Sequence, residues 1–203
     1  IIEKKSKLAK YINSPETQFF KKGNNLYNLD QARKLSNASN EIFLVEGYMD
    51  VVGMVKSGIE NCVANLGTAL TNNQIVALNQ FFDEIVICFD SDQSGYKAAY
   101  RAAESLIKEL KPEKQITFLF LPEGEDPDSY VTKNGKEVFL EYFSKTRILI
   151  HEFIFQYYKK QTTNSPSSLA IFEKSLRLVA RGIRDEFIKK YVLEYFLEKI
   201  AEL

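Results

Sequence analysis

The stretches Ile42-Phe-Leu-Val-Glu-Gly-Tyr-Met-Asp50 and Ile85-Val-Ile-Cys-Phe-Asp-Ser-Asp92 decide the fold of this chain. Each begins with consecutive apolar residues, a pattern typical of a strand that is buried on both faces of a parallel sheet. Each apolar run then ends in acidic residues, and a glycine follows where a helix can begin. Because ligands of open α/β sheets bind at the carboxyl ends of the strands, Glu46, Asp90 and Asp92 are predicted to face one crevice.

A cation is expected among these three carboxylates, because they would otherwise repel one another. Asp90 and Asp92 stand at positions i and i+2, so both can reach one ion from the same loop, and hard oxygen ligands favour Mg²⁺. Glu46, alone at its strand end, suits a general acid or base beside the metal. The structural alternatives are an ordinary Asp-x-Asp turn and a Glu46 carboxylate that stabilises the start of a neighbouring helix.

A third acidic feature, Glu125-Asp-Pro-Asp128, follows another apolar run. Asp126 and Asp128 could complete a second metal position, and Pro127 would stiffen their loop. The same residues also suit the start of a helix, with Asp126 as N-cap and Pro127 as the first helical residue. The residues alone leave both interpretations open.

The chain is predicted to divide into a basic N-terminal segment (1–40), an α/β domain (41–145) and a C-terminal helical subdomain (146–203). Thr71 and Gln74 form a plausible capping box at the start of a helix. Strands are predicted at 42–46, 62–64, 85–89 and 116–121, and helices at 48–57, 72–80, 95–110, 136–143, 147–159, 167–181 and 185–201. The predicted fold class is α/β, with a parallel sheet flanked by helices.

Composition excludes few classes of function. Lys+Arg and Asp+Glu both number 27, so the net charge gives no hint of a nucleic-acid partner. Cys62 and Cys88 lie in apolar runs without metal-site spacing, so reduced core cysteines and a cytoplasmic location are expected. No run approaches the ~18 apolar residues of a membrane span, and no signal-peptide pattern is present. Because the chain starts with Ile1, it is expected to be a piece of a longer protein.

Several motifs together resemble the Toprim domain of bacterial DNA primases (DnaG). They are Glu46-Gly-Tyr-Met-Asp-Val51, Asn65-Leu-Gly-Thr-Ala-Leu-Thr71, Phe89-Asp-Ser-Asp92 with Gly95 and Lys97-Ala-Ala99, and Leu121-Pro-Glu-Gly-Glu-Asp-Pro-Asp128. Glu plus Asp-x-Asp alone would also fit topoisomerases, small nucleases and recombination proteins. Upstream, Lys10-Tyr-Ile-Asn-Ser-Pro-Glu-Thr17 and Phe20-Lys-Lys-Gly-Asn-Asn-Leu-Tyr-Asn-Leu29 resemble the segment that leads into Toprim in primases specifically. The resemblance covers residues 10–145 closely, and Ser91 stands where the family commonly has Gly.

The resemblance implies a fragment of a DNA primase, a DNA-directed RNA polymerase of replication. Such an enzyme makes short RNA primers from ribonucleoside triphosphates on single-stranded DNA by metal-dependent nucleotidyl transfer. The family position that matches Glu46 is the proposed acid or base. The positions that match Asp90, Asp92, Asp126 and Asp128 bind Mg²⁺, for which Mn²⁺ substitutes.

A basic face that tracks nucleic acid is also implied by the resemblance. Cations for phosphate and an aromatic ring for stacking suit that role, and the candidate residues are Lys21, Lys22, Asn24, Tyr27 and Lys97. The alternative for the segment 21–27 is an ordinary solvated loop.

The implied partners are the single-stranded DNA template, ribonucleoside triphosphates, the RNA primer and a replicative helicase. The helicase contact would use a C-terminal domain that this stretch lacks. The zinc-binding domain and the N-terminal lobe of the catalytic core are also expected to lie outside it, so no zinc is expected here and the fragment alone is expected to prime weakly or not at all. Rival interpretations are a Toprim nuclease and a non-catalytic module that binds nucleic acid or helicase.

Overall fold

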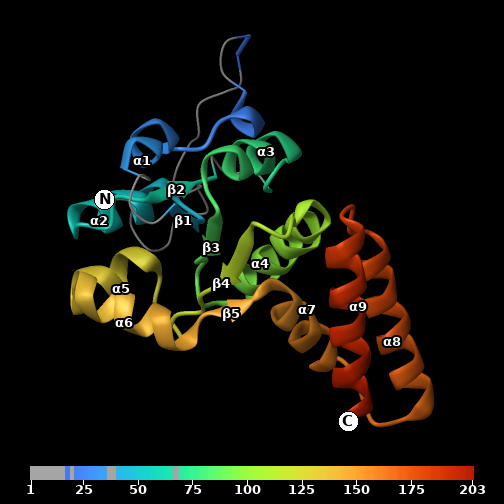
Figure 1. Cartoon of the computed structure of the whole chain (residues 1–203). Coiled ribbons are helices and arrows are strands. Elements are labelled where there is room, and N and C mark those ends of the chain that lie inside the picture. Colours follow the sequence, from blue (N-terminus) through green and yellow to red (C-terminus); the bar gives the residue numbers. More distant parts are fainter. Residues whose placement is uncertain (1–16, 19–20, 36–39, 66–68) are drawn as a thin grey trace.

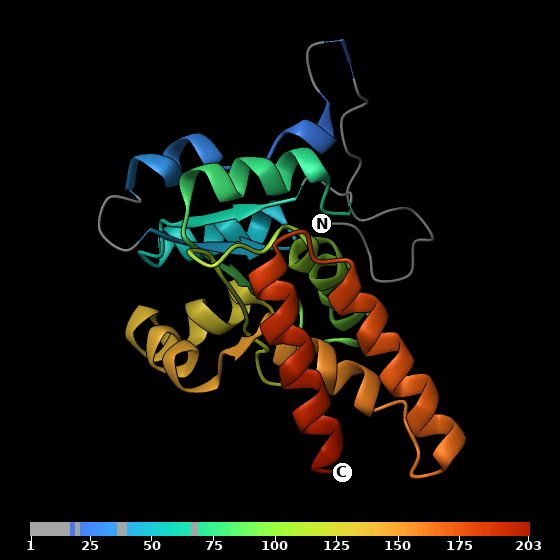
Figure 2. The same cartoon turned by 45° about the vertical axis from the view of Figure 1, so that its right-hand side comes forward.

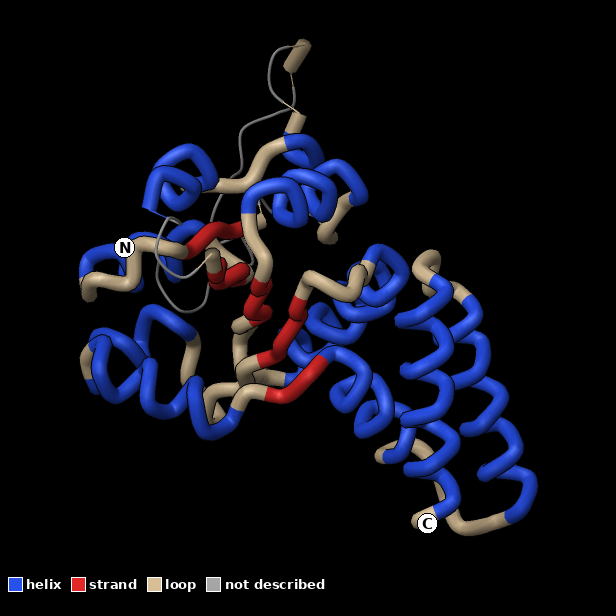
Figure 3. Tube along the Cα trace, viewed as in Figure 1, coloured by secondary structure: helices blue, strands red, loops and turns tan. Residues whose placement is uncertain are grey.

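The computed structural model describes residues 17–18, 21–35, 40–65 and 69–203. Its strands form a single sheet in the order β2-β1-β3-β4-β5 (Figures 1 and 3). The strands are β1 (Glu41–Val45), β2 (Cys62–Ala64), β3 (Glu84–Ile87), β4 (Gln115–Phe118) and β5 (Ile148–Leu149). The first four run parallel, and β5 is antiparallel to β4. The carboxyl ends of β1, β3 and β4 therefore meet at one edge of the sheet.

Helices connect the strands, and three more helices come after the last strand in the chain. They are η1 (Lys22–Asn24), α1 (Leu29–Leu35), α2 (Tyr48–Lys56), α3 (Asn72–Phe81), α4 (Gln93–Leu106), η2 (Ile107–Glu109), α5 (Pro127–Asn134), α6 (Lys136–Thr146), α7 (Ile150–Lys159), α8 (Pro166–Arg181) and α9 (Glu186–Ala201). At the start of α3, the Thr71 side chain accepts the Gln74 N–H, and Gln74 Oε1 accepts the Thr71 N–H at 3.0 Å. This confirms the predicted capping box.

Helices lie on both faces of the sheet (Figure 2), and each face packs into an apolar core. Phe43 and Val45 of β1 face a core built with α2, α5 and α6. Ile42 and Leu44 face the other way, into a larger core that includes residues of α1, α3, α4 and α7 and extends to Leu176 of α8 and Phe196 of α9. Alternate residues of a strand point to opposite faces, so a buried central strand reads as a continuous apolar run.

The predicted fold class is confirmed. Strand 62–64 is found as predicted, and the remaining predicted strands and helices recur with shifted ends. One expectation is wrong. Residues 148–149 pair with Thr117 and Phe118 as β5 instead of starting a helix at 147. The acidic segment after β4 contains helix α5, in agreement with one of its two interpretations. The division at residues 40 and 145 stays a prediction, although β5 and α7 pack against the sheet.

Among the described residues, no helix combines the length and the apolar composition that crossing a membrane requires.

Candidate active site

Glu46 directly follows β1, and Asp50 lies four residues later in the first turn of α2. The Asp50 carboxylate accepts the backbone N–H of Gly47 at 3.0 Å, which bends the chain from the strand into the helix. Asp50 is only 8% exposed. Both acids therefore belong to one turn at the carboxyl end of β1.

Asp90 and Asp92 lie in the loop between β3 and α4. Asp92 is the N-cap of α4, and its Oδ1 accepts the Gly95 N–H at 2.7 Å. A Cβ atom on Gly95 would lie 2.2 Å from the carbonyl oxygen of Asp90. Only glycine therefore allows the first turn of α4 to close against the Asp90 loop, and this contact holds the two aspartates in place.

Asp126 and Asp128 lie at the start of α5. Asp126 is the N-cap, and its Oδ1 accepts the Ser129 N–H at 2.7 Å. The interpretation of Asp126-Pro127 as a helix start is thus confirmed, and it does not exclude a role in metal binding. A Cβ on Gly53 of α2 would lie 1.9 Å from Asp128 Oδ1, so this glycine lets α5 approach α2 closely.

Ser91 joins two of these acidic loops. Its hydroxyl donates to the Glu125 carbonyl oxygen at 2.8 Å, and its backbone N–H donates to the same oxygen at 3.3 Å. Ser91 is the position where the sequence departs from the family pattern, and glycine there would lack the hydroxyl bond. The departure therefore strengthens the connection between Asp90 and Asp126.

The name acidic cluster denotes Glu46, Asp50, Asp90, Asp92, Asp126 and Asp128. The charges of Asp90, Asp92 and Asp126 act within it, and the backbone of Asp128 hydrogen-bonds to Asp50. Burial, helped by the negative charges of Asp90 and Asp126, raises the pKa of Asp50 to about 6. Burial, followed by the charges of Asp126 and Asp92, raises the pKa of Asp90. Burial, followed by the charges of Asp90 and Asp92, raises the pKa of Glu46, which Arg101 partly offsets. The three predicted acidic segments thus meet, with Asp90 at their centre.

The donor set of the acidic cluster fits a divalent metal ion. Carboxylate oxygens are hard ligands, and a cation would remove the repulsion that, after burial, raises the pKa values of Glu46, Asp50 and Asp90. In the part of the chain that the structure describes, no three acidic, His or Cys side chains lie close enough to hold one ion together. Binding one ion through three of these carboxylates therefore requires side-chain rotation. Asp92 and Asp126 cap helices through Oδ1, which leaves Oδ2 of each carboxylate for an ion.

The segment that carries Lys21, Lys22 and Asn24 is held against the start of α3. Gln74 is fully buried, and its Nε2 donates to the carbonyl oxygens of Lys22 and Asn25 at 3.2 and 2.8 Å. Asn73 Nδ2 donates to Asn24 Oδ1 at 2.8 Å. The segment is therefore a fixed part of the fold.

Tyr27 and Lys97 lie in different parts of the fold. The backbone of Tyr27 bridges to Ala64, and its ring lies 6.1 Å from that of Tyr48 at the start of α2. Lys97 is exposed in the first turns of α4, close in sequence to Asp92. A nucleic-acid role of these residues, as of Lys21, Lys22 and Asn24, stays a prediction.

Sequence reasoning missed Asp50 and Arg101. The signal for Asp50 was its position three residues after Gly47, where a helix N3 carboxylate is common. Its burial depends on the packing of α5 onto α2, which sequence does not show. No local pattern marks Arg101, whose charge acts on Glu46 from the third turn of α4.

Two stretches of the chain match known protein families. Residues 40–120 match the family described as Toprim domain, and residues 1–33 match the N-terminal domain of the DNA primase catalytic core. The expectation that this N-terminal lobe lies wholly outside the chain is therefore wrong for residues 1–33.

Two curated relatives are DNA primases. The chain is 47% identical over 147 residues to that of Pseudomonas aeruginosa, which covers 72% of the chain and 22% of the relative. It is 37% identical over 194 residues to that of Rickettsia felis, with 95% of the chain and 32% of the relative covered. The chain thus spans a fifth to a third of these relatives.

Solved structures agree. A DNA primase domain from Pseudomonas aeruginosa matches with a TM-score of 0.90 and 37% identity, over 97% of this chain and 61% of that one. A DnaG primase catalytic domain bound to single-stranded DNA matches with a TM-score of 0.86 and 34% identity, over 93% and 61%.

Proposed function

The chain belongs to the bacterial DNA primase family, and from that premise we propose that it forms the Toprim part of a primase catalytic core. In the whole protein this part takes part in metal-dependent synthesis of short RNA primers from ribonucleoside triphosphates on single-stranded DNA. The chain alone supplies the acidic cluster but primes weakly or not at all. Its free, buried cysteines fit a cytoplasmic location.

The observation that carries the proposal is the meeting of three acidic segments at one edge of the sheet. They follow β1, β3 and β4, which are neighbours in the sheet. The charges of Asp126 and Asp92 act on Asp90, those of Asp90 and Asp92 act on Glu46, and those of Asp90 and Asp126 act on Asp50. Clustered carboxylates at strand ends suit a reaction of phosphates, because a divalent cation can join the two kinds of anion.

The residues of the chain would act in distinct ways. Glu46 accepts the proton of the attacking hydroxyl, for which its raised pKa suits it. Asp90, Asp92, Asp126 and Asp128 would hold the metal, and the buried Asp50 lies nearby in the first turn of α2. When bound, Mg²⁺ or Mn²⁺ orients the triphosphate and neutralises charge on the leaving pyrophosphate.

Nucleic acid would contact the periphery of the cluster. Lys21, Lys22 and Lys97 provide cations for phosphates, and Asn24 and Tyr27 provide an amide and a ring for bases. The proposed partners are the single-stranded template, the nucleotides and the RNA primer. A replicative helicase would bind another part of the whole protein.

Mn²⁺ binding measured by electron paramagnetic resonance tests the proposal, with and without ATP. We expect Mn²⁺ to bind more tightly with ATP, and Asp90→Asn and Asp128→Asn each to weaken binding about tenfold or more. Glu113→Gln serves as the control, because Glu113 is an exposed acid that precedes the amino end of β4, whereas the cluster lies beyond the carboxyl ends of the strands. Mn²⁺ affinity that neither aspartate variant changes would show that the acids are structural. Cleavage of labelled DNA by this chain with Mg²⁺ would instead favour a Toprim nuclease.

A further inference from the structure

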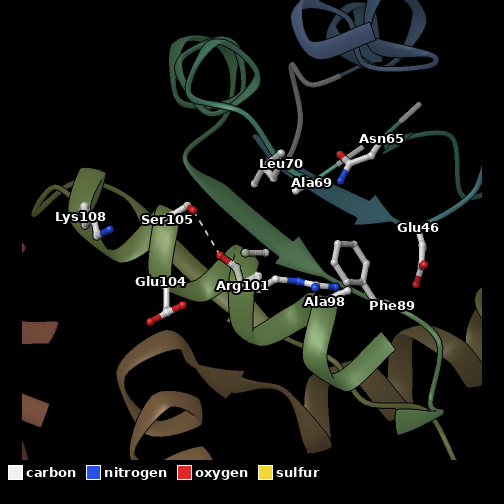
Figure 4. Close-up of a pocket in the computed structure, with 11 residues that line it drawn as sticks. Glu46, Asn65, Ala69, Leu70, Phe89, Ala98, Arg101, Glu104, Ser105 and Lys108 are labelled. Carbon is white, nitrogen blue, oxygen red and sulfur yellow. Dashed lines mark hydrogen bonds between the residues drawn. The ribbon is translucent and has the colours of Figure 1, made fainter. Parts of the chain in front are cut away.

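A cavity of about 690 Å³ opens beside Glu46 (Figure 4). One wall is the face of α4 that carries Ala98, Arg101 and Ala102, and it continues to Lys108 in η2. The opposite wall contains Asn65, just after β2. The further lining residues are Ala69, Leu70, Phe89, Glu104 and Ser105. None of the four aspartates proposed to bind metal lines it, so the cavity meets the acidic cluster only at Glu46.

The walls of this cavity suit a nucleotide. Phe89 and the alanines provide a flat apolar surface for a base. Arg101 reaches across the cavity toward Phe89 and Glu46 in Figure 4, and Lys108 stands two helical turns further on. Neither cation forms an ion pair within the described parts of the chain. Both can therefore bind phosphate.

Asn65 supplies an independent observation. Asn65 is 9% exposed, and its Oδ1 is buried without a hydrogen-bond partner among the residues that the structure describes. A buried, unsatisfied amide oxygen costs free energy and calls for a partner. Asparagine is also a side chain that pairs with base edges through both a donor and an acceptor. A small rotation of the amide into the cavity would let a base satisfy it.

We propose that this cavity binds the ribonucleotide whose 3′-hydroxyl attacks, which is either the free initiating nucleotide or the 3′ end of a short RNA. The inference rests on the proposed function, since it assigns to Glu46 the nucleotide that it deprotonates. The hydroxyl oxygen forms a bond to the α-phosphorus of the incoming triphosphate, and its proton passes to Glu46. The bond from that phosphorus to the bridging oxygen breaks, and pyrophosphate leaves with the electron pair.

Methyl NMR locates this site directly, because Ala69, Ala98 and Ala102 line the cavity. The chain labelled at alanine methyls is titrated with AMP, GMP, CMP and UMP in EDTA, so that metal-held nucleotide does not contribute. We expect at least one nucleotide to shift these three methyl signals and to leave Ala180 and Ala201 unchanged. Arg101→Ala should weaken that binding about tenfold, as loss of a charged hydrogen bond does.

Arg181→Ala is the matched control, because Arg181 is an exposed arginine of α8 outside the cavity. Its titration should equal that of the wild type. 3′-Deoxy-AMP should bind more weakly than AMP, and Glu46→Ala should abolish the difference. The dinucleotide ApA distinguishes the two possible ligands. Tighter binding of ApA than of AMP would identify the ligand as the 3′ end of an RNA, and equal binding would identify it as the free initiating nucleotide. Both results would support the cavity as a nucleotide site.

The proposal is overturned if no nucleotide shifts the three methyl signals in EDTA, or if Arg101→Ala leaves the affinity unchanged. That failure differs from failure of the proposed function, which depends on Mn²⁺ binding through Asp90 and Asp128. A chain that binds Mn²⁺ as expected but shows no methyl shifts would keep the primase assignment and lose only this cavity.

Discussion

Asp50 is the most buried carboxylate of the acidic cluster, and its titration should be visible in protein stability. Its folded pKa of about 6 lies above the model-peptide value of 3.8. The group therefore costs nothing below about pH 4, its cost grows as the pH rises from about 4 to 6, and the full cost is present above pH 6. Two units of pKa correspond to roughly 2–3 kcal/mol. We expect Asp50→Asn to raise the free energy of unfolding at pH 8 by about 2 kcal/mol without metal, and to change it little at about pH 3.5.

Urea unfolding in EDTA at the two pH values measures this effect. Asp83→Asn is the control of opposite sign, because hydrogen bonds from Lys114 and Asn40 lower the pKa of Asp83. That variant should lose stability at pH 8. An Asp50→Asn variant that is less stable than the wild type at pH 8 would mean that the carboxylate is stabilised there, and the cluster would not be repulsive.

Gly53 controls the distance between α2 and α5. Its missing Cβ leaves room for the Asp128 carboxylate. Alanine would gain about 1 kcal/mol in helix propensity but would cost about 1–3 kcal/mol in overpacking, so we expect a small net loss of stability. The larger effect should be on Mn²⁺ affinity, which should fall about tenfold because Asp128 is displaced. Titration of Gly53→Ala beside Val52→Ala, an exposed neighbour on the same helix, checks this. Equal affinities in the two variants would contradict it.

At the residue level, sequence predicted the acids that end strands and missed the acid that packing buries. Glu46, Asp90 and Asp92 could be located because a strand end fixes its own side of the sheet. The sequence allowed Asp126 to be a helix N-cap or a metal ligand. In the structure it caps α5, and it also lies close enough to Asp90 to raise the pKa of Asp90. Asp50 could not be singled out, because its burial depends on α5, more than 70 residues away in the chain.

At the level of elements, local signals were enough where the chain supplies its own hydrogen bonds. The α3 capping box and the glycine-led start of α2 were readable for that reason. β5 was not, because its two residues form a strand only through pairing with Thr117 and Phe118. Tertiary contact overrides local propensity there.

Gln74 joins two elements that are far apart in sequence, and its loss should loosen both. The side chain is fully buried and bonds to Lys22, Asn25 and Thr71. Gln74→Ala leaves those backbone groups without partners, which should cost about 2–3 kcal/mol. It should also release the segment 21–25 and weaken binding of single-stranded DNA. Gln80→Ala, an exposed residue of the same helix, should change neither property.

Chemical denaturation and fluorescence anisotropy with labelled oligonucleotide measure the two effects of Gln74→Ala. Stability lost without any change in DNA affinity would indicate that Lys21 and Lys22 belong to an ordinary solvated loop.

In the whole molecule, one apolar core runs from Leu26 beside the sheet to Phe196 of α9. The predicted helical subdomain 146–203 therefore shares its core with the sheet, and we expect a single cooperative unfolding transition. Leu176→Ala, at a fully buried position of α8, should cost about 2–5 kcal/mol. For a chain of this size that lowers the melting temperature by roughly 5–15 °C, and the sheet should unfold in the same transition.

Calorimetry of Leu176→Ala beside Leu178→Ala tests this coupling. Leu178 is 56% exposed on the same helix, so its truncation should shift the melting temperature little. Two peaks, of which Leu176→Ala moves only one, would show that the helical subdomain unfolds independently. One peak that moves as a whole would mean that residues 146–203 unfold together with the sheet and are not an independent folding unit. The helices that follow β5 would then stabilise the whole sheet, including the strands whose carboxyl ends carry the acidic cluster.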